Sequence, residues 1–147
     1  MPTLVFSTVG STLSISAGVP ATVNAAGFGA LTYTEIKELT DIGMIGGDTA
    51  IIDHMPVNHN SVYKLKGTRQ PGSLAVKGGF APTDPGQILA RAGDNSNNAY
   101  AVKLTLQNGT IFYSQGLING FKVGVGGQSA ITAMEVNIAL SGELVIV

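Results

Sequence analysis

The chain has 147 residues and a mass of 15.0 kDa, which is enough for one domain with its own hydrophobic core. It contains no cysteine, so disulfide bonds and thiol chemistry are excluded. Only 12% of the residues are charged, against about 25% in an ordinary soluble domain, and the net charge is -1. We therefore expect other copies of the chain to cover much of the surface. The alternative is a monomer with a surface of small polar residues.

The first strand is expected at residues 12–16, after an extended arm at residues 1–11. Leu13 and Ile15 alternate there with threonine and serine, and this period of two is typical of a half-buried strand. Gly10 breaks the arm before the strand begins. The pattern therefore predicts a strand with one apolar face turned towards a core.

A segment rich in turn residues follows this strand. Glycine, proline and asparagine between residues 17 and 29 predict no regular helix or strand there, while Phe28 and Leu31 could anchor the loop to a core. Alternation resumes at residues 31–34, and an acidic strand then runs to Gly43. We therefore expect a long connection between two strands.

Residues 44–61 are expected to form a long excursion with one short strand at Thr49–Asp53. Residues 62–66 and 73–77 each place apolar side chains on one face, which predicts two further strands. Pro71-Gly72 in the connection between them is a turn signal. These two strands are therefore predicted to pair with each other.

One short helix is predicted at about residues 84–93. Asp84 stands at the N-cap, Pro85 at the first helical position, Gln87 at the capping-box position and Gly93 just past the end. A helix of this length is unstable alone and must pack on a sheet. The apolar stripe that would make this contact consists of Ile88, Leu89 and Ala92.

The second half of the chain alternates in the manner of β-strands. Residues 100–107 show the clearest pattern, and Asn108-Gly109 after them predicts a type I′ turn. The whole pattern predicts a mainly β fold, a β-sandwich or barrel with one short flanking α-helix and long loops. The predicted inward residues are Tyr100, Val102, Leu104, Leu106, Met134, Val136, Ile138 and Leu140, and the further strands are at residues 110–117, 121–125, 131–140 and 144–147.

No active site and no membrane insertion are expected. The spacing of Asp53, His54 and His59 fits no standard zinc pattern. The glycines at residues 124–127 lack the lysine and the helix of a phosphate-binding loop, and no serine has a nucleophile motif. No stretch approaches the ~20 apolar residues of a membrane-spanning helix. We therefore expect no catalytic, cofactor-binding or metal-binding residue.

Charge divides the middle of the chain into an acidic and a basic part, and no acid occurs from His54 to Thr83. The two parts could meet between copies of the chain, where they would steer subunits together and penalise wrong registers. They could also be solvated or pair within one subunit, where an exposed pair contributes ~0 to 1 kcal/mol. Nucleic-acid binding is a third possibility, against which the net charge of -1 argues. The candidate interface residues are Glu35, Glu38, Asp41, Asp48, Asp53, Lys64, Lys66, Arg69 and Lys77.

The order of these parts resembles that of bacteriophage tail tube proteins, the major tail proteins of long-tailed, siphovirus-like phages. Between residues 12 and 43 the matching parts are TLSIS, GVPAT, AGF, a Leu-Thr-Tyr strand and an acidic strand ending in Asp-Ile-Gly. The likeness continues through the long excursion, the basic strands, the Asp84-Pro-Gly-Gln helix and the Lys103-Leu-Thr-Leu-Gln strand with its Asn-Gly turn. It ends with the strand at residues 131–140 and covers nearly the whole chain.

This resemblance implies a tail-tube fold in which residues 1–147 form a single domain with no appended Ig-like domain. It implies hexameric rings that stack into a hollow tube, a conduit for delivery of the genome into the bacterial host. The protein would lie in the tail of the virion and would be in the host cytoplasm during assembly. Its implied partners are other copies of itself, a tape-measure protein, tail-tip and terminator proteins, and double-stranded DNA that passes through the lumen without specific binding.

Two other functions stay open at this point: a tube subunit of a contractile tail or of a secretion or injection system, and a monomeric viral surface or binding module. A channel for DNA should not hold phosphates, since each basic contact adds a salt-dependent attraction. We therefore expect a neutral to acidic lumen, with Lys64, Lys66, Arg69 and Lys77 pointing away from it.

Overall fold

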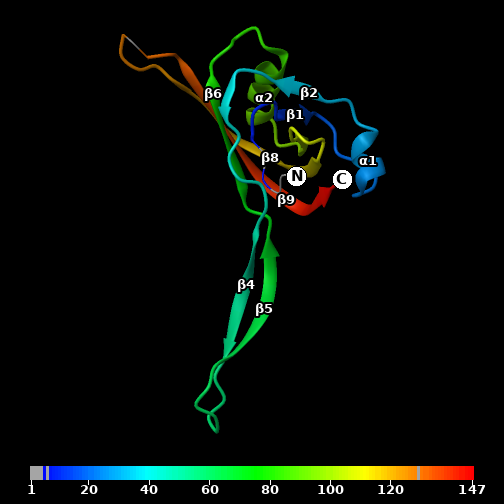
Figure 1. Ribbon diagram of the computed structural model, residues 1–147, viewed down its shortest axis with the longest axis vertical. Coiled ribbons are helices and arrows are strands. Elements are labelled where there is room, and N and C mark those ends of the chain that lie inside the picture. Colours follow the sequence, from blue (N-terminus) through cyan, green and yellow to red (C-terminus); the bar gives the residue numbers. More distant parts are fainter. Residues whose placement is uncertain (1–4, 6, 129) are drawn as a thin grey trace.

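Figure 1 shows the computed structural model, which describes residues 5, 7–128 and 130–147. Residues 1–4 and 6 of the expected N-terminal arm lie outside this part. Within it, no helix is long and apolar enough to cross a membrane. The elements in chain order are β1 (Thr12–Ser16), α1 (Ala25–Gly29), β2 (Thr34–Ile36), β3 (Leu39–Asp41), β4 (Asp48–His54), β5 (Tyr63–Gln70), β6 (Ser73–Gly79), α2 (Pro85–Asp94), β7 (Tyr100–Thr105), β8 (Ile111–Gly124) and β9 (Ala133–Ile146).

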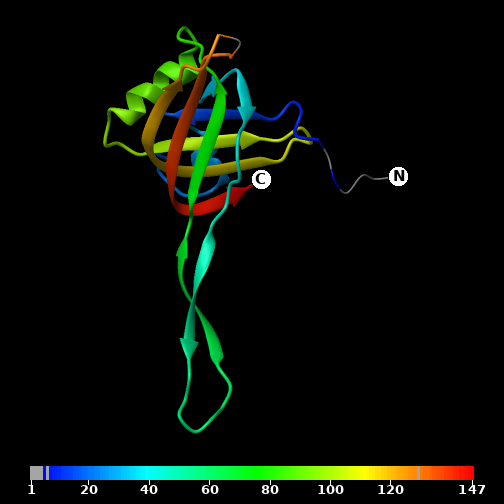
Figure 2. The same cartoon turned by 90° about the vertical axis from the view of Figure 1, so that its left-hand side faces the viewer.

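Seven of the strands form one antiparallel sheet in the order β2-β1-β7-β8-β9-β6-β3. β2 and β3 stand at the two ends of this order but follow each other in the chain. The sheet therefore curls round on itself into a barrel-like shape, and α2 flanks it with Ala90 packed into the same core (Figure 2). The predicted fold class, mainly β with a flanking helix, is confirmed.

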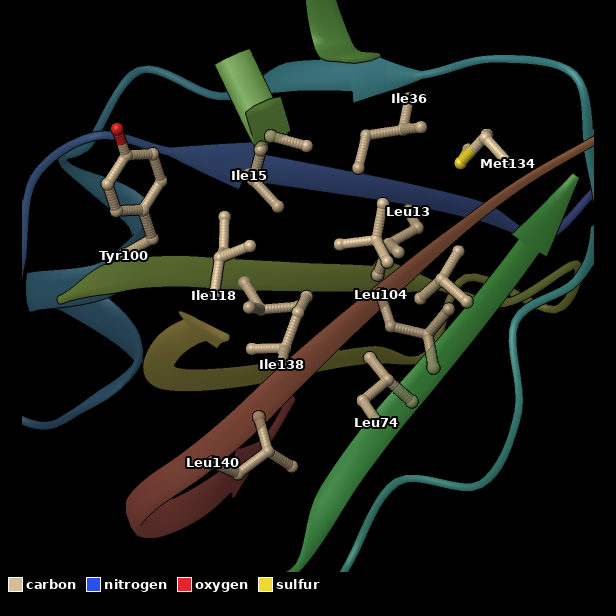
Figure 3. Packing of buried hydrophobic residues seen from close by; sticks show 14 residues of the cluster. Leu13, Ile15, Ile36, Leu74, Tyr100, Leu104, Ile118, Met134, Ile138 and Leu140 are labelled. Carbon is tan, nitrogen blue, oxygen red and sulfur yellow. The ribbon is translucent and has the colours of Figure 1, made fainter. Parts of the chain in front are cut away.

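The main hydrophobic core lies inside the curled sheet, and alternating residues of the strands fill it (Figure 3). The predicted inward residues are buried with the exception of Leu106, which is only partly buried because β7 ends at Thr105. Burial of one such side chain stabilises the fold by about 1.5–3 kcal/mol. The buried residues of β1, β6, β7 and β9 in this cluster are Leu13, Ile15, Leu74, Val76, Tyr100, Val102, Leu104, Met134, Val136, Ile138 and Leu140.

Helix α2 begins as predicted but packs with a different face. The Asp84 side chain accepts a hydrogen bond from the backbone N–H of Gln87 at 3.2 Å and so caps the helix. Of the predicted apolar stripe, only Leu89 packs against the core, where it is half-buried, while Ile88 and Ala92 are exposed. The residues that the helix buries are Gly86, Gln87, Ala90 and Gly93.

Two glycines explain why this face is buried. A Cβ atom at Gly93 would lie 2.6 Å from Ile118 Cδ1, and one at Gly86 would overlap the carbonyl oxygen of Glu35. The helix backbone therefore approaches β2 and β8 more closely than a larger residue would allow. Gly93 consequently lies inside the helix, which continues to its C-cap at Asn95, and not just past the end as predicted.

Gln87 does not serve the capping box that its position predicts. The backbone N–H of Asp84, which a capping box would bind, donates instead to the carbonyl of Ala81. Gln87 Oε1 accepts from the N–H of Ala81 at 2.9 Å, and Gln87 Nε2 donates to the carbonyls of Lys37 and Gly79 at 3.2 and 2.9 Å. Since this side chain is only 2% exposed, it is a buried link between α2, the β2–β3 connection and the end of β6.

A second, short helix, α1, occupies residues 25–29, where the sequence predicts no regular structure. Asn24 caps it by accepting a hydrogen bond from the N–H of Gly27 at 2.7 Å, so a single turn forms without apolar periodicity. Phe28 is fully buried, and its ring stacks on that of Tyr113 with 5.4 Å between centroids. The predicted anchoring of this loop is therefore confirmed, and Leu31 packs against the same cluster.

Tyr33, beside this aromatic cluster, makes the stability of the protein sensitive to high pH. Its hydroxyl donates to the carbonyl of Phe28 at 2.8 Å, and burial together with the neighbouring Tyr113 raises the pKa of Tyr33 to about 12. The folded protein thus holds this proton more tightly than the unfolded chain, in which a tyrosine pKa is about 10. The stabilising effect is complete below about pH 10 and is lost as the pH rises towards 12.

We expect the free energy of unfolding of the wild type to fall between about pH 9.5 and 11.5, and to fall less steeply in Tyr33→Phe. Urea titrations at several pH values measure this slope. Tyr63→Phe is the matched control, because Tyr63 is 49% exposed on β5. Equal slopes for Tyr33→Phe and the wild type would contradict the assignment.

Two long strands take the place of four shorter ones predicted in the second half of the chain. β8 joins the two strands predicted within residues 110–125, and β9 joins the two predicted within residues 131–147. The register of β8 against β9 shifts between Ile118 and Gly120, close to the break that the sequence predicts. A bulge of this kind disrupts the ladder locally without ending the strand.

The turn between β7 and β8 also differs from the prediction. Gly109 has a φ of 92°, but Asn108 does not have the positive φ that a type I′ turn requires. The N–H of Gly109 donates to the carbonyl of Leu106 at 3.0 Å, and the N–H of Leu106 donates to the carbonyl of Thr110 at 2.8 Å. This pattern is typical of a three-residue loop with a type I turn and a left-handed glycine.

β4 and β5 form a second, two-stranded sheet that projects from one end of the barrel (Figures 1 and 2). The predicted pairing of residues 62–66 with residues 73–77 is wrong, because β5 pairs with β4 while β6 pairs with β3 and β9. Residues 39–54 and 63–79 therefore run antiparallel as one long ribbon that is interrupted where it leaves the barrel.

Glycines lie at the point where this two-stranded ribbon is interrupted. Gly46 and Gly72 have φ values of 131° and 83°, and a Cβ atom at Gly47 would overlap the carbonyl oxygen of Gln70. Such backbone conformations and close approaches favour glycine over every other residue. Below, the projecting residues 48–70 are called the β4–β5 hairpin, and the other described residues are called the body.

Candidate functional site

The β4–β5 hairpin is exposed on both of its faces. Ile51, Ile52 and Leu65 are 56%, 53% and 60% exposed, and no residue of the hairpin belongs to either hydrophobic cluster of the body. A single two-stranded hairpin is at best marginally stable in water. Exposed apolar side chains on such an element point to a surface that another molecule covers.

The strand register gives the hairpin two different faces. Ile52 lies opposite Leu65, and His54 lies opposite Tyr63, so these residues share one face. Ile52, Tyr63 and Leu65 are called the apolar face below. The other face carries Asp53 opposite Lys64, together with Lys66. The hairpin is therefore amphipathic although neither face is covered.

Two of the predicted interface residues pair with each other inside the subunit. Lys64 Nζ lies 3.0 Å from Asp53 Oδ1, and both side chains are more than half exposed. An exposed pair of this kind contributes about 0–1 kcal/mol. For Asp53 and Lys64, the structure thus shows the alternative of pairing within one subunit.

The other charges of the hairpin are differently placed. Lys66 lies opposite Ile51, Arg69 opposite Thr49, and Asp48 opposite Gln70. Across the described residues, none of these three charged side chains forms an ion pair. Their charges therefore remain available to a partner, and Lys66 and Arg69 make the middle and base of β5 basic.

The acidic candidates Glu35, Glu38 and Asp41 lie far from the hairpin. They stand on β2, on β3 and on the connection between them, at the end of the body opposite the hairpin (Figures 1 and 2). The acidic segment of the sequence is thus split, because Asp48 and Asp53 lie on the hairpin itself. A subunit carries a basic strand at one end and, at the other, an acidic corner in which these three acids outnumber Lys37.

Lys77 lies on the body and belongs to a row of alternating charges. It stands opposite Asp41 of β3 and opposite Glu135 of β9, and Glu135 in turn stands opposite Lys122 of β8. Glu135 and Lys122 are not among the residues predicted from the sequence, because only the register between distant strands brings them beside Lys77. This row makes the outer face of four strands nearly neutral.

No group of three or more histidine, aspartate or glutamate side chains that could hold a metal ion occurs in the described part of the chain. A hollow of about 420 Å³ lies between residues 8–11, β3 and the end of β7. Its lining carries one charged residue, Asp41, and no histidine. The candidate functional surfaces are therefore the β4–β5 hairpin and the opposite end of the body.

The comparisons with known proteins agree with this architecture. The sequence matches the family of the phage tail tube protein, TTP, over residues 15–147. No curated protein sequence matches the chain. The fold is similar to a chain of the anti-feeding prophage (AFP) baseplate, 6-fold symmetrised, with a TM-score of 0.74 and 13% identity, covering 100% of this chain and 97% of that one.

Two further solved structures share the fold. One is the tail of an empty gene transfer agent particle with C6 symmetry, with a TM-score of 0.65 and 15% identity over 90% of this chain and 92% of that one. The other is the sheath/tube terminator of an extracellular contractile injection system, PVC, with a TM-score of 0.61 and 11% identity over 99% of each chain. The family match extends over most of the sequence, and it confirms the resemblance that the order of the sequence parts indicates. The chain belongs to the phage tail tube protein family and is a structural subunit of a tail tube.

Proposed function

We propose that the chain assembles into hexameric rings, and that these rings stack into a hollow tube that conducts double-stranded DNA into a bacterial host. The observation that carries this proposal is the projecting β4–β5 hairpin, whose apolar and basic residues lack a covering surface within the subunit. Similar chains occur in the 6-fold symmetrised AFP baseplate and in the gene transfer agent tail with C6 symmetry. A hairpin at one end and an acidic corner at the other suit a repeated head-to-tail contact.

The role is structural and without catalysis in this proposal. The protein would reside in the tail of the virion after assembly in the host cytoplasm, with a tape-measure protein, tail-tip and terminator proteins as partners. A fold shared with a tube terminator and a tube-terminating cap supports such neighbours at the ends of the tube. In this proposal the protein needs no cofactor and no metal ion.

Passage of DNA requires a lumen that does not hold phosphates. The chain has 8 basic and 9 acidic residues, and Lys77 stands between two acids on neighbouring strands. We propose a neutral to acidic lumen, with Lys64, Lys66, Arg69 and Lys77 pointing away from it. A tube structure with these four side chains lining the channel would overturn this part.

A tube subunit of a contractile injection system is the second candidate, because the fold is also similar to chains of the AFP and PVC assemblies. Such a tube would lie inside a sheath. A gene for a sheath protein beside the gene of this chain, or binding of a sheath protein to the assembled tube, would favour this candidate over a flexible tail.

Negative-stain electron microscopy of the purified protein over a concentration series, together with sedimentation, tests the proposed function. We expect hollow rings or tubes with sixfold end views, if necessary after addition of tail-tip complexes that nucleate assembly. Monomers alone, also in the presence of tail-tip complexes, would contradict the proposal.

Charge reversal on the hairpin should affect stacking more than folding. Lys66→Glu or Arg69→Glu removes an exposed charge from β5, so we expect the thermal unfolding midpoint to change by less than about 2 °C. Tube length at a fixed protein concentration should fall, since the reversed charge opposes association. Unchanged tube lengths in both variants would count against a contact between subunits at these residues.

A further inference from the structure

A groove of about 240 Å³ lies at the end of the body opposite the hairpin. It is formed where β3 begins, β6 ends and β9 begins, and Figures 1 and 2 show these segments at that end. Backbone of two glycines makes one wall, so the groove is open to a long side chain or a strand. Its lining residues are Glu38, Thr40, Gly78, Gly79, Ile131 and Ala133.

The rim of this groove is apolar on the side of the β8–β9 turn. Ile131 is 83% exposed, and Val125 in the same turn is 81% exposed. An exposed apolar side chain in the wall of a groove, as at Ile131, is typical of a surface that a partner covers. The same kind of side chain is exposed on the hairpin, where Ile51 lies opposite Lys66 on the same face and is 56% exposed. The two ends of the subunit thus carry matching apolar surfaces.

Glu38 gives the groove its charge. It has a φ of 62°, and among the described residues no other residue except glycine has a positive φ. At six other positions with positive φ the chain uses glycine, which takes this conformation without strain. The carboxylate of Glu38 forms no hydrogen bond or ion pair with a described residue. A charged side chain thus stands where glycine would suit the backbone better, with its charge left for a partner.

We propose that this groove receives the β4–β5 hairpin of a second copy of the chain, with Glu38 opposite Lys66 and Ile131 against Ile51, which shares a face with Lys66. This inference rests on the proposed function and names the contact that stacks one subunit on the next. In this arrangement an acidic side chain of one copy faces a basic side chain of the other, and apolar side chains of the two copies are in contact. Such complementarity favours one specific register between the two copies.

The length of the hairpin fits this contact. β5 has 8 residues and spans about 26 Å at about 3.3 Å per residue. Because the hairpin starts at the lower end of one body, the upper end of the next body meets its base and middle, where Lys66 and Arg69 lie. The apolar tip, with Met55 and Val57 exposed, extends past the groove along the neighbour. The two contact surfaces differ, so each subunit can bind two others and a filament results.

A charge swap tests the contact. Glu38→Lys and Lys66→Glu are each expected to raise the critical concentration for tube assembly about ten-fold or more, because each places like charges opposite each other. The double variant Glu38→Lys/Lys66→Glu restores opposite charges and is expected to return the critical concentration to within about three-fold of the wild type. The full-length chain is used, and thermal unfolding of each unassembled variant establishes that the body is folded.

The outcomes separate this inference from the proposed function. Wild-type tubes together with failure of the double variant to recover would overturn the pairing of Glu38 with Lys66. Wild-type tubes that are insensitive to both single changes and to Ile131→Asp would overturn the groove as the docking site, while the tube itself would stand. Absence of wild-type assembly, even with tail-tip nuclei, would instead overturn the proposed function.

Discussion

Replacing the β4–β5 hairpin, residues 48–70, with an Asn-Gly turn is expected to abolish tube assembly and to leave the body folded. No residue of this segment belongs to either hydrophobic cluster of the body, so its removal takes away no core contact. The ends to be joined are close, because a Cβ atom at Gly47 would lie 2.6 Å from Pro71 Cα. Electron microscopy measures assembly, and circular dichroism with urea unfolding measures the fold.

A second variant, Ile52→Ser/Leu65→Ser, keeps the hairpin and changes only its apolar face. It separates the effect of the apolar side chains from the effect of removing the whole hairpin. Since both side chains are more than half exposed, the stability of the isolated subunit should change by less than about 1 kcal/mol. Assembly of this variant should still be strongly reduced, because the buried apolar contact between copies is lost. Tubes formed by the deletion variant, or an unfolded body, would contradict the assignment of the hairpin to contacts between subunits.

Gln87→Leu is expected to lower the free energy of unfolding by about 3–5 kcal/mol, which is the largest effect of any single substitution considered. The leucine leaves the N–H of Ala81 and the carbonyls of Lys37 and Gly79 without their bonds to the Gln87 side chain. An unsatisfied buried polar group costs about 1–3 kcal/mol. Leucine has a similar volume, so the loss reports the hydrogen bonds rather than a cavity. Urea unfolding of the unassembled subunit measures the loss.

Ile88→Ala is the control for this substitution, because Ile88 is the next residue of the same helix and is 44% exposed. Its change in unfolding free energy should be below about 1 kcal/mol. A second comparison is Gln87→Glu, which keeps an acceptor for Ala81 but replaces the donor to two carbonyls. We expect Gln87→Glu to lose the least unfolding free energy at low pH, because the protonated carboxylic acid can donate one hydrogen bond. A loss below about 1 kcal/mol in Gln87→Leu would show that the link is not needed for stability.

Several elements could be placed from the sequence because their signals are local. The alternation in β1, β7 and β9 marks an inward face wherever the strand lies in the sheet, and Leu13, Val102 and Val136 are accordingly buried. The Asp84-Pro85 start of α2 is likewise a local signal, since the cap bonds the next turn of its own helix. The order of these parts along the chain also indicates the tail tube family.

The candidate charges show the limit of such signals. The sequence groups Glu38, Asp53 and Lys66 by proximity along the chain, but it cannot say which of them face each other. The structure pairs Asp53 with Lys64 inside one hairpin and places Glu38 at the opposite end of the subunit. Proximity in sequence therefore gives a set of candidate residues but not the partner of each one.

What the sequence by itself determined is the approximate position of most strand-forming segments, the start of the flanking helix, the inward face of most strands and the family. What only the tertiary structure decided is which strands pair and which face of α2 is buried. β5 pairs with β4 and not with β6 because the ladder depends on contacts between residues that are distant in the chain. Gly86 and Gly93 weaken an isolated helix, and they become its buried face only because the backbone of β2 and the side chain of Ile118 approach them in the folded protein.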